Sequence, residues 1–492
     1  MIYTKRFEQH SEYEEFISGG TNVYKPNVSV CEDNYHVHYN PGPPIDKVDD
    51  SEIYGVIEIG NIEPFSYEGG EQTGISLTTR ATNTWVLTQK SDWLHVEPIR
   101  GTGSTTLTVE ADEYDNTEEN REGFFKVRYT MPDVRYVTTK YDITQEHAPD
   151  PKTYPLTFEI TGDGNIIWKA QNTAYTCTIE YKKNDGEWTS ITSSTGGTNI
   201  SVVAGDTVQF RGDNVTYSSG SSRYNTFSGT TCQFKAKGNI MSLINSTDFV
   251  TATTLQSAYT FYNLFRECTG LTDASNLVLS TTTLVNNCYS NMFYGCTSLT
   301  TAPALPATTL ASSCYSSMFY NCNSLTTAPE LPATTLVQSG YSKMFSYCSS
   351  LTTAPALPAT TLANCCYDSM FSYCRSLTTA PVLPSTTLAQ YCYYFMFSNC
   401  TSLTTAPTLP ATTLAYHCYS YMFYNCTALT TVPSILPATT LANSCYSNMF
   451  SRCTSLTTAP ALPATTLAGS CYISMFQGCT SLTNVPNLPA LH

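Results

Sequence analysis

Residues 314–336 read Cys314-Tyr-Ser-Ser-Met318-Phe319-Tyr-Asn-Cys322-Asn-Ser-Leu325-Thr-Thr-Ala-Pro329-Glu-Leu331-Pro332-Ala-Thr-Thr-Leu336. The Met-Phe pair of this stretch returns every 26 residues, and an imperfect earlier copy has Leu264-Phe265 in its place. The copies are marked by Met292, Met318, Met344, Met370, Met396, Met422, Met449 and Met475, with one step of 27 where Ile435 is inserted. A fixed period of this length predicts a solenoid, in which each copy packs only against its neighbours.

The first half of each copy predicts a short helix. Cys314, Met318 and Cys322 are spaced i, i+4 and i+8, which places them on one stripe of a helix. The second half is rich in Thr and Pro and predicts a short strand and turn. Pro329 and Pro332 have no N–H to donate, so ladder pairing there must be short or interrupted. We therefore expect the invariant Met and Phe side chains to form the core of an α/β solenoid.

The repeats resemble the BspA-like leucine-rich repeats, whose copies read roughly aromatic-x-x-Cys-x-Ser-Leu. Phe319-Tyr-Asn-Cys322-Asn-Ser-Leu325 and its equivalents carry the match. The resemblance covers almost half the chain, and we assign residues 246–492 to this solenoid. It implies recognition of a surface rather than chemistry.

The charge of the chain is unevenly distributed. The formal net charge is −15, but from Leu271 onward there are three acidic and three basic residues, so the whole imbalance lies before that point. Nucleic-acid binding needs a basic stripe, which is missing, and we expect no nucleic-acid partner. No apolar stretch approaches the length that spans a membrane. The first residues also lack the apolar core of a signal peptide, so we expect either a chain that is not exported by that route or one whose leader has been removed.

The chain has 20 Cys, 17 of them from Cys268 onward. Within a helix, Cys at i and i+8 would lie ~12 Å apart, too far for a disulfide or a shared metal. Gly340 stands where other copies have the first Cys, while Cys348 is retained. We expect free, buried thiols that act as small hydrophobic side chains. Disulfides between neighbouring copies and metal binding are the alternatives, and we assign no metal or cofactor.

Residues 1–48 form a small unit of their own. Ser11-Glu-Tyr-Glu14 predicts the start of a short helix, and residues 27–31 and 36–39 flank a hairpin turn, before the linker Asn40-Pro-Gly-Pro-Pro44. His36 and His38 alternate on one strand, where ordinary strand histidines are favoured over a metal pair. The stretch from Tyr24 to Pro41 resembles N-terminal segments of virion proteins from crAss-like and related gut phages, which implies a segment that docks on capsid or tail proteins.

Residues 49–149 predict an all-β domain with alternating apolar and polar residues. Ser91-Asp-Trp93-Leu-His-Val96, Gly101-Thr-Gly103, Arg121-Glu-Gly123 and Asp142-Ile-Thr-Gln145 resemble a BACON domain, which is an immunoglobulin-like sandwich. The family name presumes carbohydrate binding, but no site residue is transferred. We interpret Trp93 and Trp85 as core residues rather than sugar platforms.

Residues 150–245 predict a second β-sandwich. Alternating runs such as Leu156-Thr-Phe-Glu-Ile160 are separated by turns at Asp163-Gly164 and Asn184-Asp185-Gly186. Because this domain runs directly into the first repeat, we expect it to cap the N-terminal end of the solenoid. The chain simply stops after a strand at its other end, where we expect a shield, for example a partner subunit.

The candidate binding site comes from comparing the copies within this chain. The Tyr that follows the first Cys never varies, which indicates a structural role. Two columns do vary, and two adjacent copies become aromatic together: Gln390, Tyr391, Tyr394, Phe395, Tyr416, His417 and Tyr421. We predict that Tyr391, Tyr394, Phe395, Tyr416, His417 and Tyr421 form a ligand-binding cluster on an exposed face. A chance cluster or a contact between subunits is the alternative.

Catalysis is not expected. Glycoside hydrolysis needs two carboxylates ~5–9.5 Å apart, and the repeats from Leu271 onward hold only Asp273, Glu330 and Asp368, in widely separated copies. No nucleophile triad, phosphate loop or Cys-x-x-Cys motif is present. We assign no catalytic residue.

Two functions fit. The first is a phage virion fibre or decoration protein, docked through residues 1–48, that binds host-surface or mucin glycans or proteins through the solenoid or the BACON domain. The second is a bacterial cell-surface adhesin with the same modules. We expect a homo-oligomer, most simply a trimer.

Overall fold

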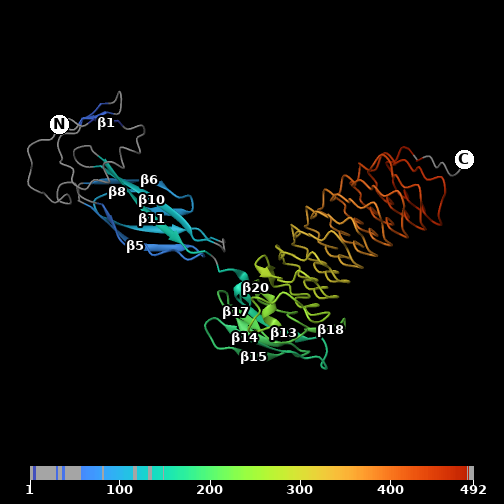
Figure 1. The fold of residues 1–492 in the computed structure, drawn as a ribbon, viewed down its shortest axis with the longest axis horizontal. Coiled ribbons are helices and arrows are strands. Elements are labelled where there is room, and N and C mark those ends of the chain that lie inside the picture. Colours follow the sequence, from blue (N-terminus) through green and yellow to red (C-terminus); the bar gives the residue numbers. More distant parts are fainter. Residues whose placement is uncertain are drawn as a thin grey trace, which may run out of the picture. The chain divides into compact units, whose positions relative to one another are not determined.

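The structure is a computed structural model that describes residues 57–79, 83–114, 119–130, 136–147, 149–484 and 486, together with three short strands before them (Figure 1). The chain divides into two compact units, Met1–Asp150 and Pro151–His492. In the described residues, helix is limited to two 3-10 turns, η1 (Pro151–Thr153) and η2 (Ile240–Leu243). The molecule is therefore built almost entirely from strands and turns.

The first three strands form a small antiparallel sheet in the order β1-β3-β2. They are β1 (Thr4–Arg6), β2 (Ser29–Cys31) and β3 (His36–His38). Val30 pairs with Val37, so the predicted hairpin is confirmed. The predicted helix after Ser11 and the linker at Asn40 lie outside the described residues.

Two four-stranded antiparallel sheets follow, in the orders β4-β5-β9-β7 and β11-β10-β6-β8. Their strands are β4 (Glu58–Ile59), β5 (Gly70–Thr78), β6 (Thr84–Lys90), β7 (Leu94–Glu97), β8 (Arg100–Thr102), β9 (Thr105–Ala111), β10 (Arg121–Thr130) and β11 (Tyr136–Gln145). Leu77 and Val109 of one sheet and Trp85 and Val127 of the other belong to one buried core. Buried and exposed residues alternate along strands such as β7, as expected of sheets with one face on a core.

The second unit begins with another β domain, of which one sheet has the order β15-β14-β17-β12-β20-β21 and the other β16-β13-β19-β18. Its strands are β12 (Leu156–Gly162), β13 (Gly164–Ala170), β14 (Thr178–Lys183), β15 (Thr189–Thr192), β16 (Thr198–Val202), β17 (Thr207–Arg211), β18 (Ser218–Gly220), β19 (Arg223–Thr226) and β20 (Gln233–Asn239). The hairpin predicted at residues 184–186 is confirmed, because β14 pairs with β15. The hairpin predicted at residues 163–164 is wrong, since β12 and β13 lie in different sheets.

This β domain passes directly into the repeats. Strands β21 (Leu271–Asp273) and β22 (Leu277–Val278) of the first repeat pair in parallel with β20. The amides of Tyr217 and Phe227 donate to the carbonyls of Thr260 and Leu264, at 2.9 and 2.8 Å. A single core runs from the β domain through the repeats. The donors of the β domain thus satisfy acceptors of the first coil.

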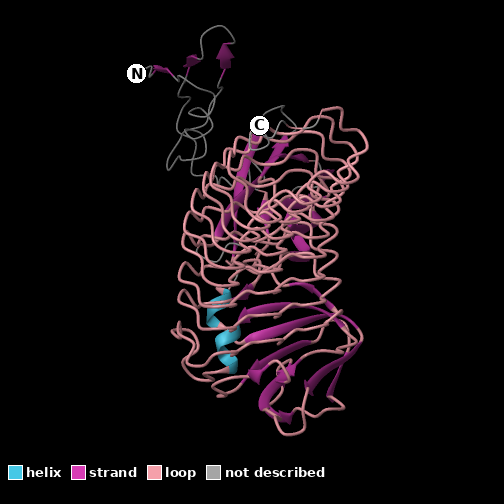
Figure 2. Ribbon diagram, turned by 90° about the vertical axis from the view of Figure 1, so that its right-hand side faces the viewer, coloured by secondary structure: helices cyan, strands magenta, loops and turns pink. Residues whose placement is uncertain are grey.

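The short helix predicted in each repeat is wrong, and with it the α/β solenoid. The segment is a ribbon of consecutive turns, and the coils stack as loops in Figure 2. Within a coil, alternate amides bond three residues back, as Met318 does to the carbonyl of Tyr315 at 3.1 Å. The amides between them donate to the next coil, as Phe319 does to Met344 at 3.0 Å. We call this segment the turn ribbon; its alternating pattern satisfies its buried backbone groups without a helix.

Every fourth residue of the turn ribbon has a left-handed backbone. In residues 313–321, Ser313, Ser317 and Asn321 have φ of 54, 54 and 60°. The period is therefore four residues rather than the 3.6 of a helix. Two adjacent residues of each four are buried, which gives a core of Cys-Tyr, Met-Phe and Cys. The predicted core residues are correct although the backbone that carries them is not.

Equivalent side chains stack from coil to coil. The Phe319 and Phe345 rings lie 5.6 Å apart at an interplanar angle of 1°, and the invariant Tyr rings form a parallel ladder at 5.7–6.0 Å. The second Cys of each repeat donates its thiol hydrogen to the carbonyl of a Phe in the preceding coil, as Cys374 does to Phe345 at 3.1 Å. On the opposite side, single parallel bridges such as Thr327 to Thr353 join the coils, in agreement with the predicted interruption by Pro.

Candidate functional site

The outer face of the turn ribbon carries the two variable columns that the sequence comparison singled out. The first column precedes the first Cys of each copy and contains Asn287, Ser313, Ser339, Cys365, Tyr391, His417, Ser444 and Ser470. The second lies four residues further on and contains Asn291, Ser317, Lys343, Ser369, Phe395, Tyr421, Asn448 and Ser474. Every member of both columns has a positive φ, between 50 and 58°. The variable positions are thus the left-handed residues of the ribbon.

Aromatic residues are unfavourable at such positions. An L-residue in the left-handed region costs roughly 1–2 kcal/mol, and Asn and Gly tolerate it best. Most copies accordingly place Asn or Ser there, whereas Tyr391, Phe395, His417 and Tyr421 adopt φ of 58, 51, 52 and 55°. His is more often found in this region than other aromatic residues, so the local backbone leaves Tyr391, Phe395 and Tyr421 without an explanation.

The structure brings the six predicted residues together; Tyr391, Tyr394, Phe395, Tyr416, His417 and Tyr421 are called the aromatic patch from here on. Tyr391 stacks on His417 at 5.1 Å, and Phe395 stacks on Tyr421 at 4.4 Å. Tyr394 and Tyr416 stand perpendicular to these stacks, with interplanar angles of 84–89°. Only Tyr416 is exposed, at 39 %, and the other five are half-buried against one another.

The two stacks leave ring faces open at their ends. Each stack has two rings, and the next residue of the column is small: Cys365 and Ser369 on one side, Ser444 and Asn448 on the other. The outer faces of Tyr391 and Phe395 are therefore turned toward coil 365–374. A ligand ring that continued either stack would lie over these small residues.

Charged residues, which are rare in the repeats, adjoin the aromatic patch on that same side. The Asp368 carboxylate accepts hydrogen bonds from the hydroxyls of Ser369 at 2.7 Å and Ser342 at 3.4 Å. Burial raises the pKa of Asp368, and the Ser369 bond and the Lys343 charge oppose the rise. Burial and then the Asp368 charge raise the pKa of the Cys365 thiol. Asp368, which occupies the same column as Tyr394, was not among the predicted site residues.

His417 is the one imidazole of the aromatic patch. Its Nδ1 lies 2.9 Å from the Ser420 hydroxyl, and burial lowers its pKa. This environment favours the neutral imidazole of His417, stacked on Tyr391. His417 therefore adds ring surface to the aromatic patch rather than a charge at neutral pH.

A second row of aromatic side chains was not predicted. Tyr294, Tyr320, Tyr347 and Tyr373 follow one another on successive coils, with ring centroids 4.6, 5.2 and 4.3 Å apart. Their rings cover one another's faces, and Arg266 covers the first ring at 4.1 Å. The row therefore presents ring edges to a ligand. The available signal was the Tyr found one or two residues after the Met-Phe pair in four adjacent copies.

The tryptophans of the first unit do not form a sugar platform. Trp85 is 3 % exposed, and its indole N–H donates to the carbonyl of Gly103 at 3.1 Å. Trp93 is half-buried, and the guanidinium of Arg121 lies 4.2 Å from its ring centroid. A Cβ on Gly123 would lie 2.4 Å from the Trp93 ring, so the other side of the ring is packed on backbone.

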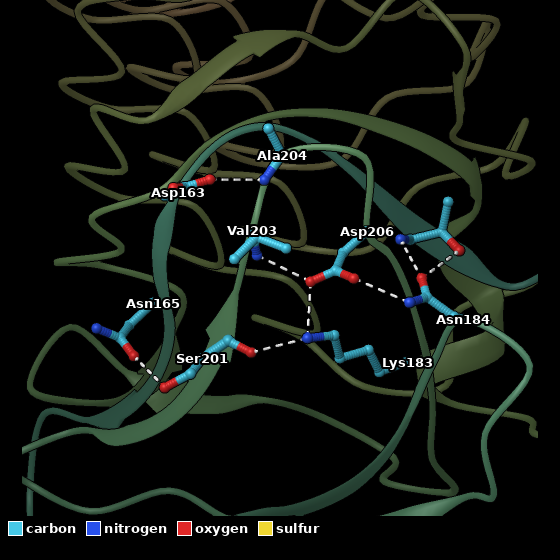
Figure 3. A network of polar contacts seen from close by, with 9 residues as sticks. Asp163, Asn165, Lys183, Asn184, Ser201, Val203, Ala204 and Asp206 are labelled. Carbon is cyan, nitrogen blue, oxygen red and sulfur yellow. Dashed lines mark hydrogen bonds and ion pairs between the residues drawn. The ribbon is translucent and has the colours of Figure 1, made fainter.

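A polar network in the second unit is structural (Figure 3). Asp206 accepts from Lys183 Nζ at 2.7 Å, from the Asn184 side chain at 2.8 Å and from the amide of Val203 at 2.8 Å. Hydrogen bonding from Lys183 is the main cause that lowers the pKa of Asp206 to about 2. The carboxylate is already satisfied by its own loops, which leaves no free polar group for a ligand.

The cysteines of the described residues are free thiols, and most are buried. Burial raises the pKa of Cys314, Cys348 and Cys366 to about 12. Within the described ranges, no group of three or more His, Cys, Asp or Glu side chains is placed to hold a metal ion. The same residues include no helix with the length and apolarity needed to cross a membrane.

Comparison with known families agrees with two of the predicted modules. Residues 83–146 match the BACON model, described as an N-terminal binding domain. Residues 262–404 and 368–490 match the model of the BspA-type leucine-rich repeat region. No curated protein and no solved structure gives a significant match. The chain thus combines a BACON domain with a region of BspA-type leucine-rich repeats.

Proposed function

We propose that this chain is a structural protein of a phage virion, a fibre or decoration protein, that binds glycans of the host surface or of mucin through the aromatic patch. The observation that supports the binding proposal is the backbone strain at aromatic residues of the aromatic patch. Three of its rings, Tyr391, Phe395 and Tyr421, occupy left-handed positions where most other copies have Asn or Ser. Residues held against local preference gather at functional sites.

A sugar fits this surface better than a charged ligand does. The repeats from Leu271 onward are balanced, with three acidic and three basic residues. Tyr, Ser and Asn supply rings and hydroxyl or amide groups, which recognise a sugar by stacking and hydrogen bonds. Adhesion should therefore change little with salt concentration. No catalytic role is proposed.

The virion assignment rests on residues 1–48, in which the stretch from Tyr24 to Pro41 resembles phage virion segments; this resemblance implies docking on capsid or tail proteins. The same proposal includes an immunoglobulin-like sandwich in each β domain. It also includes a trimeric assembly, because several weak binding sites on one particle bind more tightly together than singly. The alternative is an adhesin on a bacterial surface, with the same binding face. Finding the gene among capsid and tail genes would favour the virion.

The experiment replaces the aromatic patch by residues that the chain itself uses. Tyr391→Asn, Phe395→Asn, Tyr416→Asn and Tyr421→Asn each introduce a residue found in the same column of another copy. Because Asn tolerates a left-handed backbone, the quadruple variant should keep its melting temperature. We expect it to lose adhesion to host cells and to mucin glycans.

Two outcomes would contradict the proposal. Normal adhesion by the quadruple variant would move the binding site elsewhere, and the BACON domain would become the better candidate. Dissociation of the variant into monomers, measured by light scattering, would show that the aromatic patch is a contact between subunits.

A further inference from the structure

We infer that a neutral pyranose ring with adjacent hydroxyl groups binds in a notch on coil 365–374, beside the aromatic patch. The notch is defined by Lys343, Cys365, Asp368 and Ser369, and by the open ring faces of Tyr391 and Phe395. This inference rests on the proposed glycan binding. It adds the position of one sugar and the side chains that select it.

The notch results from the sizes of successive side chains in the second column. Lys343, Ser369, Phe395 and Tyr421 occupy successive coils. Neighbouring backbone segments of this kind lie ~4.8 Å apart, and Tyr421 stacks on Phe395 at 4.4 Å. Ser369 is the only small residue between the exposed Lys343 and the Phe395 ring. A sugar ring over Ser369 would stack on Phe395 from the side opposite Tyr421.

Asp368 supplies the polar floor. Its column holds Ser in five other copies and a bulky residue in two; the Ser residues are Ser290, Ser316, Ser342, Ser420 and Ser447, and the others are Tyr394 and Ile473. Ser290 uses its hydroxyl to donate to the carbonyl of Ser316 in the next coil at 3.1 Å. A carboxylate cannot donate, so Asp368 does not repeat this bond to the following coil; it accepts instead from the hydroxyl of Ser342 in the preceding coil, at 3.4 Å.

The carboxylate has capacity to spare. Two carboxylate oxygens offer about four acceptor sites, and the described donors to Asp368 side-chain oxygens are the hydroxyls of Ser342 and Ser369. The side chain is half-buried rather than enclosed. Two adjacent sugar hydroxyls match two carboxylate oxygens.

The pair of opposite charges favours a neutral sugar. An acidic sugar in the notch would meet the Asp368 carboxylate, and a cationic amino sugar would meet the Lys343 ammonium group. Hydroxyl groups donate to Asp368 and accept from Lys343, so an uncharged ring satisfies both. Electrostatic complementarity of this kind sets specificity.

The test uses the full-length protein and two substitutions already sampled by the chain. Asp368→Ser restores the residue of its column, and Lys343→Ser matches Ser317 and Ser369. The probes are immobilised mucin glycans, separated into a neutral fraction and a sialylated and sulfated fraction. We expect the unmodified protein to prefer the neutral fraction and Asp368→Ser to bind it roughly 10- to 100-fold more weakly. Lys343→Ser should weaken binding in the same direction, with melting temperatures unchanged.

The outcomes separate this inference from the proposed function. Ser290→Ala, in the same column but far from the notch, should bind normally. If Asp368→Ser and Lys343→Ser bind like the unmodified protein while the quadruple Asn variant does not, the notch is wrong and the aromatic patch stands. Preference for the sialylated and sulfated fraction would overturn the neutral class of ligand. If the unmodified protein binds neither fraction, both the notch and the glycan proposal fail.

Discussion

At the scale of single residues, the same amino acid has two different roles depending on its place in the four-residue period. Phe371 is fully buried in the ladder, 5.8 Å from Phe345 and 5.7 Å from Phe397. Phe395 is half-buried on a left-handed position. One ring holds the stack of coils together, and the other projects from it.

Replacing these two rings should therefore have unequal effects. Phe371→Ala should destabilise the solenoid by about 3–5 kcal/mol, since it leaves a cavity in a packed core. Phe395→Asn removes a stacked ring but relieves backbone strain, two effects of about 1 kcal/mol each and of opposite sign. Urea denaturation measures both. Equal destabilisation by both substitutions would mean that the buried and outward-facing positions of the four-residue period are wrongly assigned.

Asp206 gives a prediction for acid stability. Its folded-state pKa of about 2 lies below the ordinary value of 3.8, so the ionised side chain stabilises the folded state. That contribution, about 2 kcal/mol, is fully present above pH ~4 and is lost as the pH falls through ~2. Asp206→Asn should reduce stability by a similar amount at neutral pH and should flatten its dependence on pH in that acidic range. The exposed Asp185, replaced by Asn, is the control, and the same loss in both variants would contradict the role of the network.

At the scale of the element, the core residues of the repeats could be predicted from the sequence, but their backbone conformation could not. Cys, Met and Cys at i, i+4 and i+8 suit a helix of 3.6 residues per turn nearly as well as a ribbon with a period of four. What separates them is the residue at every fourth position: Asn291, Ser317 and Asn321 are typical of a left-handed backbone and weak in a helix. Variable Asn and Ser in aligned copies are equally typical of an exposed surface, so the sequence alone does not separate the two backbones.

The candidate site was predictable for a related reason. Neighbouring copies align side chains in columns, so aromatic residues in two adjacent copies had to meet. Asp368 occupies the same column as Tyr394, but its contacts with the Ser342 and Ser369 hydroxyls become apparent only when the coils are stacked. The half-burial of the aromatic patch was not predictable either, since it results from the rings packing on one another.

The thiol ladder leads to a prediction about reactivity. Each second Cys donates to a carbonyl of the preceding coil, and burial raises the thiol pKa values. Because the thiolate is the reactive form, alkylation of the folded protein should be slow. After unfolding without a reducing agent, most thiols should react with a maleimide or with Ellman's reagent. A near-absence of free thiol would show disulfides between neighbouring copies.

At the scale of the whole molecule, residues 1–48 are proposed to dock the protein on a particle and not to fold the rest. Deletion of residues 1–44 should leave the thermal transition of the remaining domains unchanged, because two separate cores account for them. It should abolish incorporation into particles, measured by immunoblotting of purified virions. Full incorporation of the shortened protein would refute the docking role.

The backbone hydrogen bonds that join neighbouring coils within the turn ribbon point the same way. In the turn ribbon every second peptide directs its N–H to the following coil and its carbonyl to the preceding one. Peptide dipoles of about 3.5 D that align in this way add, so the stack carries a macrodipole along its axis, as an α-helix does. An element that extends the ribbon beyond a later coil must bring acceptors, and one that extends it before an earlier coil must bring donors. A two-fold axis would set like groups against each other at such a joint, and we therefore expect subunits to associate through the flanks of the coils.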